Sequence, residues 1–93
     1  MKKQTYASVW DAIEDAPEAA ASMRVRADLM IAVQRHVAAS GETQSRAAKR
    51  LGITQPRLND LLRGRIDKFS LDALVNMLAR AGRQVTVKVN KAA

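Results

Sequence analysis

The feature that most constrains the fold of this chain is a single glycine, Gly52, between two short segments that each suit a helix. Residues 44–51 follow Thr43 and residues 55–63 follow Thr54, and a threonine at such a position caps a helix N-terminus. Glycine adopts the left-handed backbone conformation that a tight turn between helices needs. The sequence therefore predicts two short helices joined by a sharp turn at Gly52.

The apolar residues of this stretch predict which face of each helix is buried. Ala47, Ala48 and Leu51 lie on one side of the first helix, and Leu58 and Leu61 lie on one side of the second. The small side chain of Ala48 suits a place where two helices cross closely. The opposite, polar faces are left for solvent or for a binding partner.

A long helix is predicted before this pair and a shorter one after it. Pro17 and Glu18 are typical of a helix start, which places the first helix over about residues 16–39. Ser70 is expected to cap the second helix, and Gly82 to end it. The residues expected to face the core are Leu29, Met30, Val33 and Val37 in the first helix and Leu71, Leu74, Val75, Leu78 and Ala81 in the second.

Residues 84–89 alternate polar and apolar side chains with a period of two, which predicts a short β-strand. The rest of the chain predicts no partner strand, so its backbone groups would stay unpaired within one copy. Antiparallel pairing with the same strand of a second copy would satisfy them. We expect a homodimer held by Val85, Val87 and Val89; the alternative is a frayed tail whose alternation is accidental.

Near the N-terminus, Tyr6, Val9, Trp10 and Ile13 fall on one face of a short amphipathic helix. A helix of this length is not stable alone, so it must pack against something. Its own domain is one possibility and a partner protein is the other.

The charge of the chain is concentrated on the predicted pair of helices. Residues 1–20 hold two basic and four acidic residues, whereas residues 21–93 hold fourteen basic and five acidic ones. Residues 43–68 alone hold seven basic and two acidic residues. Net charge by itself can serve only solubility, but a basic segment on two helices joined by a tight turn is typical of a nucleic-acid binder.

The second helix of the pair begins with side chains suited to reading bases in the DNA major groove. Gln55 can pair with both N6 and N7 of adenine, and Pro56 can contact a thymine methyl group. Arg57 can reach guanine O6 and N7, or a phosphate. Asn59 falls on the side opposite the leucines of this helix. Each of these residues has a solvent-exposed structural role as its alternative.

Other polar residues of the stretch are expected to hold the DNA backbone. Gln44 opens the first helix of the pair, where an amide and the backbone N–H groups can bind a phosphate. Arg63, Arg65 and Lys68 are expected to contact phosphates. Asp60 can accept a hydrogen bond from cytosine N4, or pair with the arginines three residues before and after it.

Composition argues against catalysis and against a metal or cofactor. The chain has no cysteine, one histidine (His36) and no glycine-rich phosphate loop, so no catalytic group or metal site is expected. No segment is long and apolar enough for a membrane span or a signal peptide. We expect a cytoplasmic protein associated with the nucleoid.

The helix-turn-helix stretch resembles that of the lambda-repressor-like, or XRE, family. The residues that carry the resemblance are Thr43-Gln44, Ala47-Ala48, Leu51-Gly52-Ile53, Gln55, Leu58 and Leu61. Two residues depart from the family pattern. Asn59 stands where serine is usual, so its contact is expected to differ. Glu42 stands where an apolar residue is common, and its charge either weakens DNA binding or favours the start of the helix.

A narrower likeness, to small XRE proteins that are often HigA-like antitoxins, extends over most of the chain. The matching segments are Val9-Trp10-Asp11, Arg26-Ala27-Asp28-Leu29, Gln55-Pro56-Arg57, Asp60-Leu61, Arg63-Gly64, Lys68-Phe69-Ser70-Leu71 and Val85-Thr86-Val87-Lys88-Val89. The resemblance implies a dimeric repressor that binds its own operator and neutralises a RelE-type ribonuclease toxin. Many such proteins have no known toxin.

These observations predict an all-α, lambda-repressor-like helical bundle with a helix-turn-helix and a C-terminal β-strand that pairs across a dimer. The expected partner is double-stranded DNA with a palindromic operator, and the expected function is that of an autoregulatory repressor and antitoxin. The alternatives are a repressor without a toxin and a protein-interaction module with weak or lost DNA binding. The expected parts are an N-terminal arm (1–15), a DNA-binding domain (16–83) and a dimerisation strand with a tail (84–93).

Overall fold

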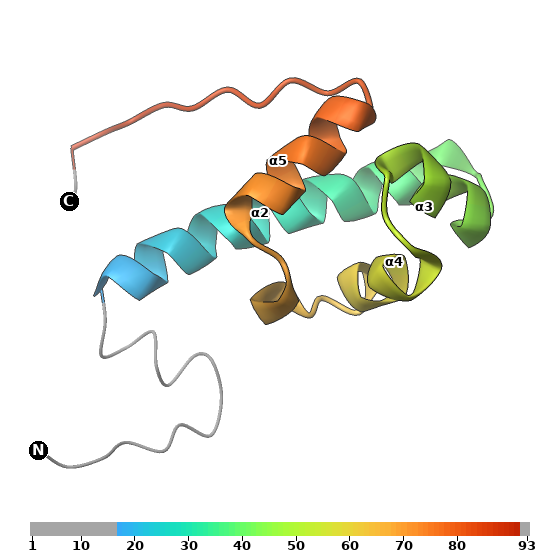
Figure 1. The fold of residues 1–93 in the computed structure, drawn as a ribbon. Coiled ribbons are helices and arrows are strands. Elements are labelled where there is room, and N and C mark those ends of the chain that lie inside the picture. Colours follow the sequence, from blue (N-terminus) through green and yellow to red (C-terminus); the bar gives the residue numbers. More distant parts are fainter. Residues whose placement is uncertain (1–16, 92–93) are drawn as a thin grey trace, which may run out of the picture.

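The longest element is helix α2 (Pro17–Ser40); α4, η1 and α5 pack against it, and α3 packs against α4 and α5 (Figure 1). A computed structural model describes residues 17–91, which form an all-helical bundle. Within that range the elements are α2 (Pro17–Ser40), α3 (Gln44–Leu51), α4 (Gln55–Leu62), the 3-10 helix η1 (Ile66–Lys68) and α5 (Leu71–Arg80). The helix boundaries predicted from capping residues and glycines are confirmed to within a residue or two.

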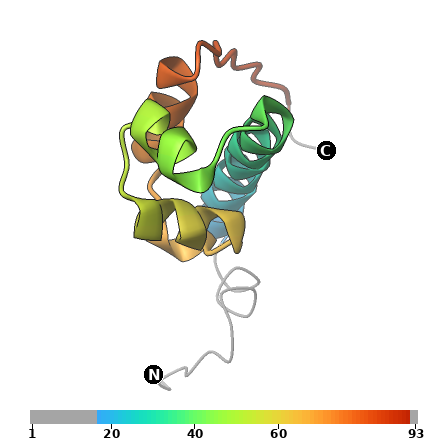
Figure 2. The same cartoon turned by 90° about the vertical axis from the view of Figure 1, so that its right-hand side faces the viewer.

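The core lies between α2, α3, α4 and α5, whose arrangement is seen in the view roughly along α2 (Figure 2). Every described α-helix contributes to it, and η1 is followed at once by the buried ring of Phe69. The most deeply buried large side chains are Val33, Leu58, Leu61, Phe69, Leu74 and Met77. Aliphatic side chains with one aromatic ring therefore hold the bundle together.

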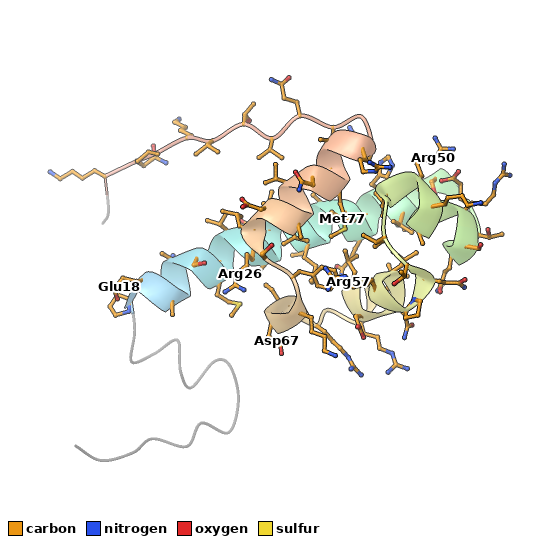
Figure 3. The ribbon with its side chains drawn as sticks, viewed as in Figure 1. Glu18, Arg26, Arg50, Arg57, Asp67 and Met77 are labelled. Carbon is orange, nitrogen blue, oxygen red and sulfur yellow. The ribbon has the colours of Figure 1, made fainter. Side chains whose placement is uncertain are left out.

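Helix α5 presents a different stripe to the core from the one predicted. Leu74 and Leu78 are buried as expected, but Leu71 is 41% exposed and Met77 is 2% exposed. Leu71 lies in the first turn of α5, at the edge of the stripe that positions 74, 77 and 78 form. Met77, labelled in Figure 3, is one of the buried core residues that α5 contributes.

Beyond α5, residues 83–91 leave the bundle as an extended segment that runs back in the direction opposite to α2 (Figure 1). The N–H of Arg83 donates to the carbonyl of Leu78 at 2.8 Å. Among residues 17–91, no backbone hydrogen bond involves residues 84–91 and no β-strand is present. The strand across a dimer therefore stays a prediction, and the N-terminal arm with Trp10 lies outside the described residues.

No helix in the described range is long and apolar enough to cross a membrane.

Gly52 is required by its backbone conformation and also lies against α5. Its φ is +76°, and a Cβ atom built on it would lie 2.4 Å from Nε of Arg80. We expect Gly52→Ala to lower the free energy of unfolding by about 1–2 kcal/mol, as measured by urea denaturation. Most of this loss comes from the backbone, because the side chain of Arg80 is exposed and can move aside.

Gly41 offers a matched control for this substitution. Its φ is +69°, and a Cβ there would meet nothing within 4 Å. Gly41→Ala should therefore show the backbone cost alone, and Gly52→Ala should exceed it by the cost of moving Arg80. A smaller loss at Gly52 than at Gly41 would contradict this account.

Candidate nucleic-acid interface

Two threonine caps and one left-handed glycine build the turn between α3 and α4. The hydroxyl of Thr43 accepts a hydrogen bond from the N–H of Arg46 at 3.2 Å, and that of Thr54 accepts from the N–H of Arg57 at 3.3 Å. The N–H of Ile53 donates to the carbonyl of Ala48 at 3.0 Å across the turn. These bonds satisfy backbone groups that helix ends would otherwise leave unpaired. The predicted helix-turn-helix geometry is confirmed.

The buried faces of α3 and α4 fix which of their residues are presented outward. Ala47, Ala48 and Leu51 are each 3% exposed, and Leu58 and Leu61 are fully buried. Ala47 and Ala48 thus lie on the side of α3 that packs against the bundle. The opposite side of α4, which carries Gln55 and Asn59, is turned to solvent.

Three of the predicted base-reading residues are freely accessible on that face. Gln55, Pro56 and Asn59 are all exposed, and Asn59 lies one turn after Gln55 on the same side of α4. Gln44 is exposed at the first position of α3. Each of the two helices therefore begins with an exposed side-chain amide, next to the free backbone N–H groups of the helix N-terminus.

Arg57 occupies a different environment from the free, base-reading position predicted for it. Its guanidinium lies over the ring of Phe69, 4.4 Å from the ring centroid, and its Nη1 donates to the carbonyl of Lys68 at 3.0 Å. The residue is half-buried and lies beside α4 in Figure 3. A cation over an aromatic face is attracted by the ring electrons. In this conformation Arg57 joins α4 to the segment around η1.

Asp60 pairs with cations other than those expected. Its carboxylate lies 3.7 Å from Nη1 of Arg65 and 3.9 Å from Nζ of Lys68, rather than beside Arg57 or Arg63. The chain turns sharply after α4, where the N–H of Arg65 donates to the carbonyl of Asp60 at 3.1 Å. This turn brings the side chains of Arg65 and Lys68 back toward the carboxylate of Asp60. These pairs are partly exposed and therefore weak individually.

The segment after α4 is thus held at two points one helical turn apart. Arg57 holds the backbone at Lys68, and Asp60 holds the side chains of Arg65 and Lys68. The segment contains the short helix η1, and α4 orients Arg65, which precedes η1, and Lys68, its last residue.

Exposed cations surround the polar face of α4. Arg63 caps the C-terminal end of α4 and is exposed, as are Arg65 and Lys68 beyond it. Arg46 and Lys49 are exposed on α3. Figure 3 shows nitrogen-tipped side chains projecting from this end of the molecule. The positive charge predicted from sequence is therefore gathered around the accessible amides.

Two contacts at this site were missed by the sequence analysis. Glu42, noted as a departure from the family pattern, is bound by Arg50 through both carboxylate oxygens at 2.7–3.1 Å, so its charge is neutralised within the protein. Nε2 of Gln34 donates to the carbonyl of Leu61 at 2.8 Å and so ties α2 to the end of α4. The sequence signal for the second contact was Gln34 itself, a polar residue at a core-facing position between Val33 and Val37.

Comparison with known families agrees with this geometry. Residues 12–90 match the family model of a helix-turn-helix domain. The chain belongs to this helix-turn-helix family.

The match covers the helix-turn-helix itself, the rest of the described bundle and nearly all of the extended C-terminal segment. Tyr6, Val9 and Trp10 precede it. Curated proteins give no match to this helix-turn-helix protein.

Proposed function

We propose that this helix-turn-helix protein is a sequence-specific DNA-binding repressor of transcription that acts as a homodimer on a palindromic operator. The observation that carries the proposal is the accessible amide face at the start of α4, with Gln55 and Asn59 exposed and Leu58 and Leu61 buried behind them. A short helix supported in this way fits the major groove, where each base pair has a distinct pattern of donors and acceptors.

The residues around α4 divide into two roles under this proposal. Gln55 reads adenine, and Pro56 and Asn59 complete the contact with base edges. Gln44, at the start of α3, binds a backbone phosphate. The cations Arg63, Arg65 and Lys68 contact phosphates beside the groove, so they contribute affinity without sequence preference.

Arg57 and Asp60 act as positioning residues in this scheme. Arg57 holds the backbone carbonyl of Lys68 against α4. Asp60 restrains the side chains of Arg65 and Lys68 through ion pairs. The proposal is of a binding protein and not an enzyme, in line with the lone His36 and the lack of cysteine.

The finer proposal, supported by sequence resemblance alone, is a HigA-like member of the XRE group that represses its own operon and neutralises a RelE-type toxin. A small basic reading frame next to this gene, whose product binds this protein, would support the antitoxin role. An isolated gene would favour a repressor without a toxin.

Titration onto DNA tests the proposed function directly. A labelled duplex from the protein's own promoter and a scrambled duplex of equal length are titrated at two salt concentrations. We expect the promoter to bind about 1,000-fold more tightly, or better, than the scrambled duplex. Both affinities should fall with salt, because binding at cationic side chains releases counterions from the DNA.

Equal binding to the two duplexes would contradict sequence-specific repression. With a strong salt dependence it would mean that only phosphate contacts are made. A protein-interaction module would then be the better account of the fold.

A further inference from the structure

The C-terminal extended segment presents apolar side chains that nothing in the described bundle covers. Val85 is half-buried against the core, whereas Val87 is 82% exposed and Val89 is 89% exposed. Side chains two residues apart in an extended chain lie on the same face. The three valines therefore share one face, of which only the first is packed.

Helix α2 carries a second apolar stripe beside its buried one. Val25 is 48% exposed, Leu29 is half-buried, and Ala32 and Ala39 are exposed. Their spacing of three, four and seven residues places them along one side of the helix. Leu29, Ala32 and Ala39, together with Leu78, Val85 and neighbouring polar residues, line an open hollow of about 540 Å³ between α2, α5 and the extended segment.

We propose that a second copy of this chain covers this face, with residues 85–89 of the two copies paired antiparallel and the two-fold axis passing at Val87. This inference rests on the proposed function, in which the repressor is a homodimer, and it specifies that dimer's interface. A two-stranded ribbon alone is marginally stable in water. The valine face of the ribbon is therefore packed on the α2 stripes of both copies.

The position of the axis follows from which side chains would lie opposite each other. Directly opposed residues of an antiparallel pair lie on the same face, so only a register that pairs valine with valine buries the apolar face. With the axis at Val87, Val85 faces Val89 of the partner subunit and Thr86 faces the partner's Lys88. All three valines are then paired, and no two lysines are opposed.

The neighbouring registers fail on the same criteria. An axis at Lys88 sets the two lysines directly against each other, and like charges opposed in this way are destabilising. An axis at Thr86 leaves Val89 opposite Arg83 of the partner subunit. Of these three registers, only the one with its axis at Val87 pairs every valine with a valine and opposes no two lysines.

The location of this face is also compatible with DNA binding. The extended segment lies on the far side of α2 from α4 in both views of the fold (Figures 1 and 2). A second copy on that side leaves Gln55 and the cations near η1 uncovered.

Single-cysteine variants test the register, because the natural chain contains no cysteine. Directly opposed residues have Cα atoms about 4.5–5.5 Å apart, within the range that a disulfide spans. Residues displaced by two positions are about 7–8 Å apart, which a disulfide does not span without backbone movement. The full-length variants Val87→Cys, Thr86→Cys and Lys88→Cys are oxidised and separated on a non-reducing gel. We expect Val87→Cys to form a covalent dimer at least about ten times faster than the other two.

A second pair of variants tests the part of α2 in the interface. Ala32 and Ala38 are both exposed on α2, but only Ala32 lines the hollow, so a glutamate at either site leaves the core intact. Ala32→Glu should weaken dimerisation at least about tenfold in sedimentation equilibrium. Ala38→Glu should leave it unchanged.

Several outcomes would overturn this inference. Faster cross-linking at Thr86→Cys or Lys88→Cys would refute the register. A wild-type monomer would mean that something other than a second copy covers the face. A wild-type dimer that Val87→Cys does not cross-link and Ala32→Glu does not weaken would place the interface elsewhere.

The proposed function can fail or stand separately from this inference. A protein that selects its promoter over scrambled DNA without cross-linking at Val87→Cys keeps the DNA-binding function and loses this dimer. Cross-linking at Val87→Cys without promoter selection confirms the dimer and refutes the repressor.

Discussion

Replacing Phe69 with alanine is expected to lower the free energy of unfolding by about 3–5 kcal/mol. The ring is 1% exposed and is among the largest fully buried side chains of the bundle. It follows η1 and packs into the core that α2, α4 and α5 share. A domain of this size has a total stability of about 5–15 kcal/mol, so the variant should be marginally folded in a urea titration.

The Phe69→Leu variant serves as the control, because it keeps most of the apolar volume and removes the aromatic face. Its loss should be clearly smaller than that of alanine, and part of the loss should depend on Arg57. In a double-mutant cycle, Phe69→Leu and Arg57→Ala should couple by about 0.5–1 kcal/mol, the size of a partly exposed cation–π contact. Additive effects would show that the guanidinium gains nothing from the ring. A loss below about 1 kcal/mol for Phe69→Ala would contradict the buried position itself.

The second large effect is on DNA. Gln55→Ala is expected to weaken binding to the operator by about 1–3 kcal/mol while leaving binding to scrambled DNA unchanged. The side chain is exposed on α4, so its removal should alter stability by less than about 0.5 kcal/mol. Competition titrations with the two duplexes measure the difference. An equal loss on both would mean that Gln55 touches only the backbone.

Arg57→Ala provides the contrast that the structure suggests. Because its guanidinium holds Lys68 and Phe69 within the protein, its removal should weaken binding to both duplexes by a similar factor, through loosening of the segment that bears Arg65 and Lys68. A loss confined to the operator would restore the base-reading role that the sequence predicted for Arg57.

The contrast between Gln55 and Arg57 shows where sequence reasoning succeeds and where it stops. Caps, glycines and apolar spacing are local signals, so the helices and the exposed position of Gln55 could be predicted from a few neighbouring residues. The environment of Arg57 depends on Phe69, twelve positions later, which the turn after α4 brings back against it. No local sequence pattern predicts that contact.

Other interactions were out of reach of the sequence for the same reason. The partners of Asp60 follow from the sharp turn after α4, and the bond from Gln34 to the carbonyl of Leu61 links positions 27 residues apart. The exposure of Leu71 depends on which side of α5 faces α2. Residue spacing indicates that side only approximately, so a residue at its edge can be exposed.

The bond from Gln34 to Leu61 bears on the half-site spacing that the protein accepts in an operator. It fixes the end of α4 to α2, and in the proposed dimer the other side of α2 packs against the second copy. The distance between the two reading helices is then set by the thickness of rigid helices and not by loops. One inserted base pair would shift the half-sites by about 3.4 Å and rotate them by about 35°, so an operator lengthened at its centre would engage only one subunit at a time.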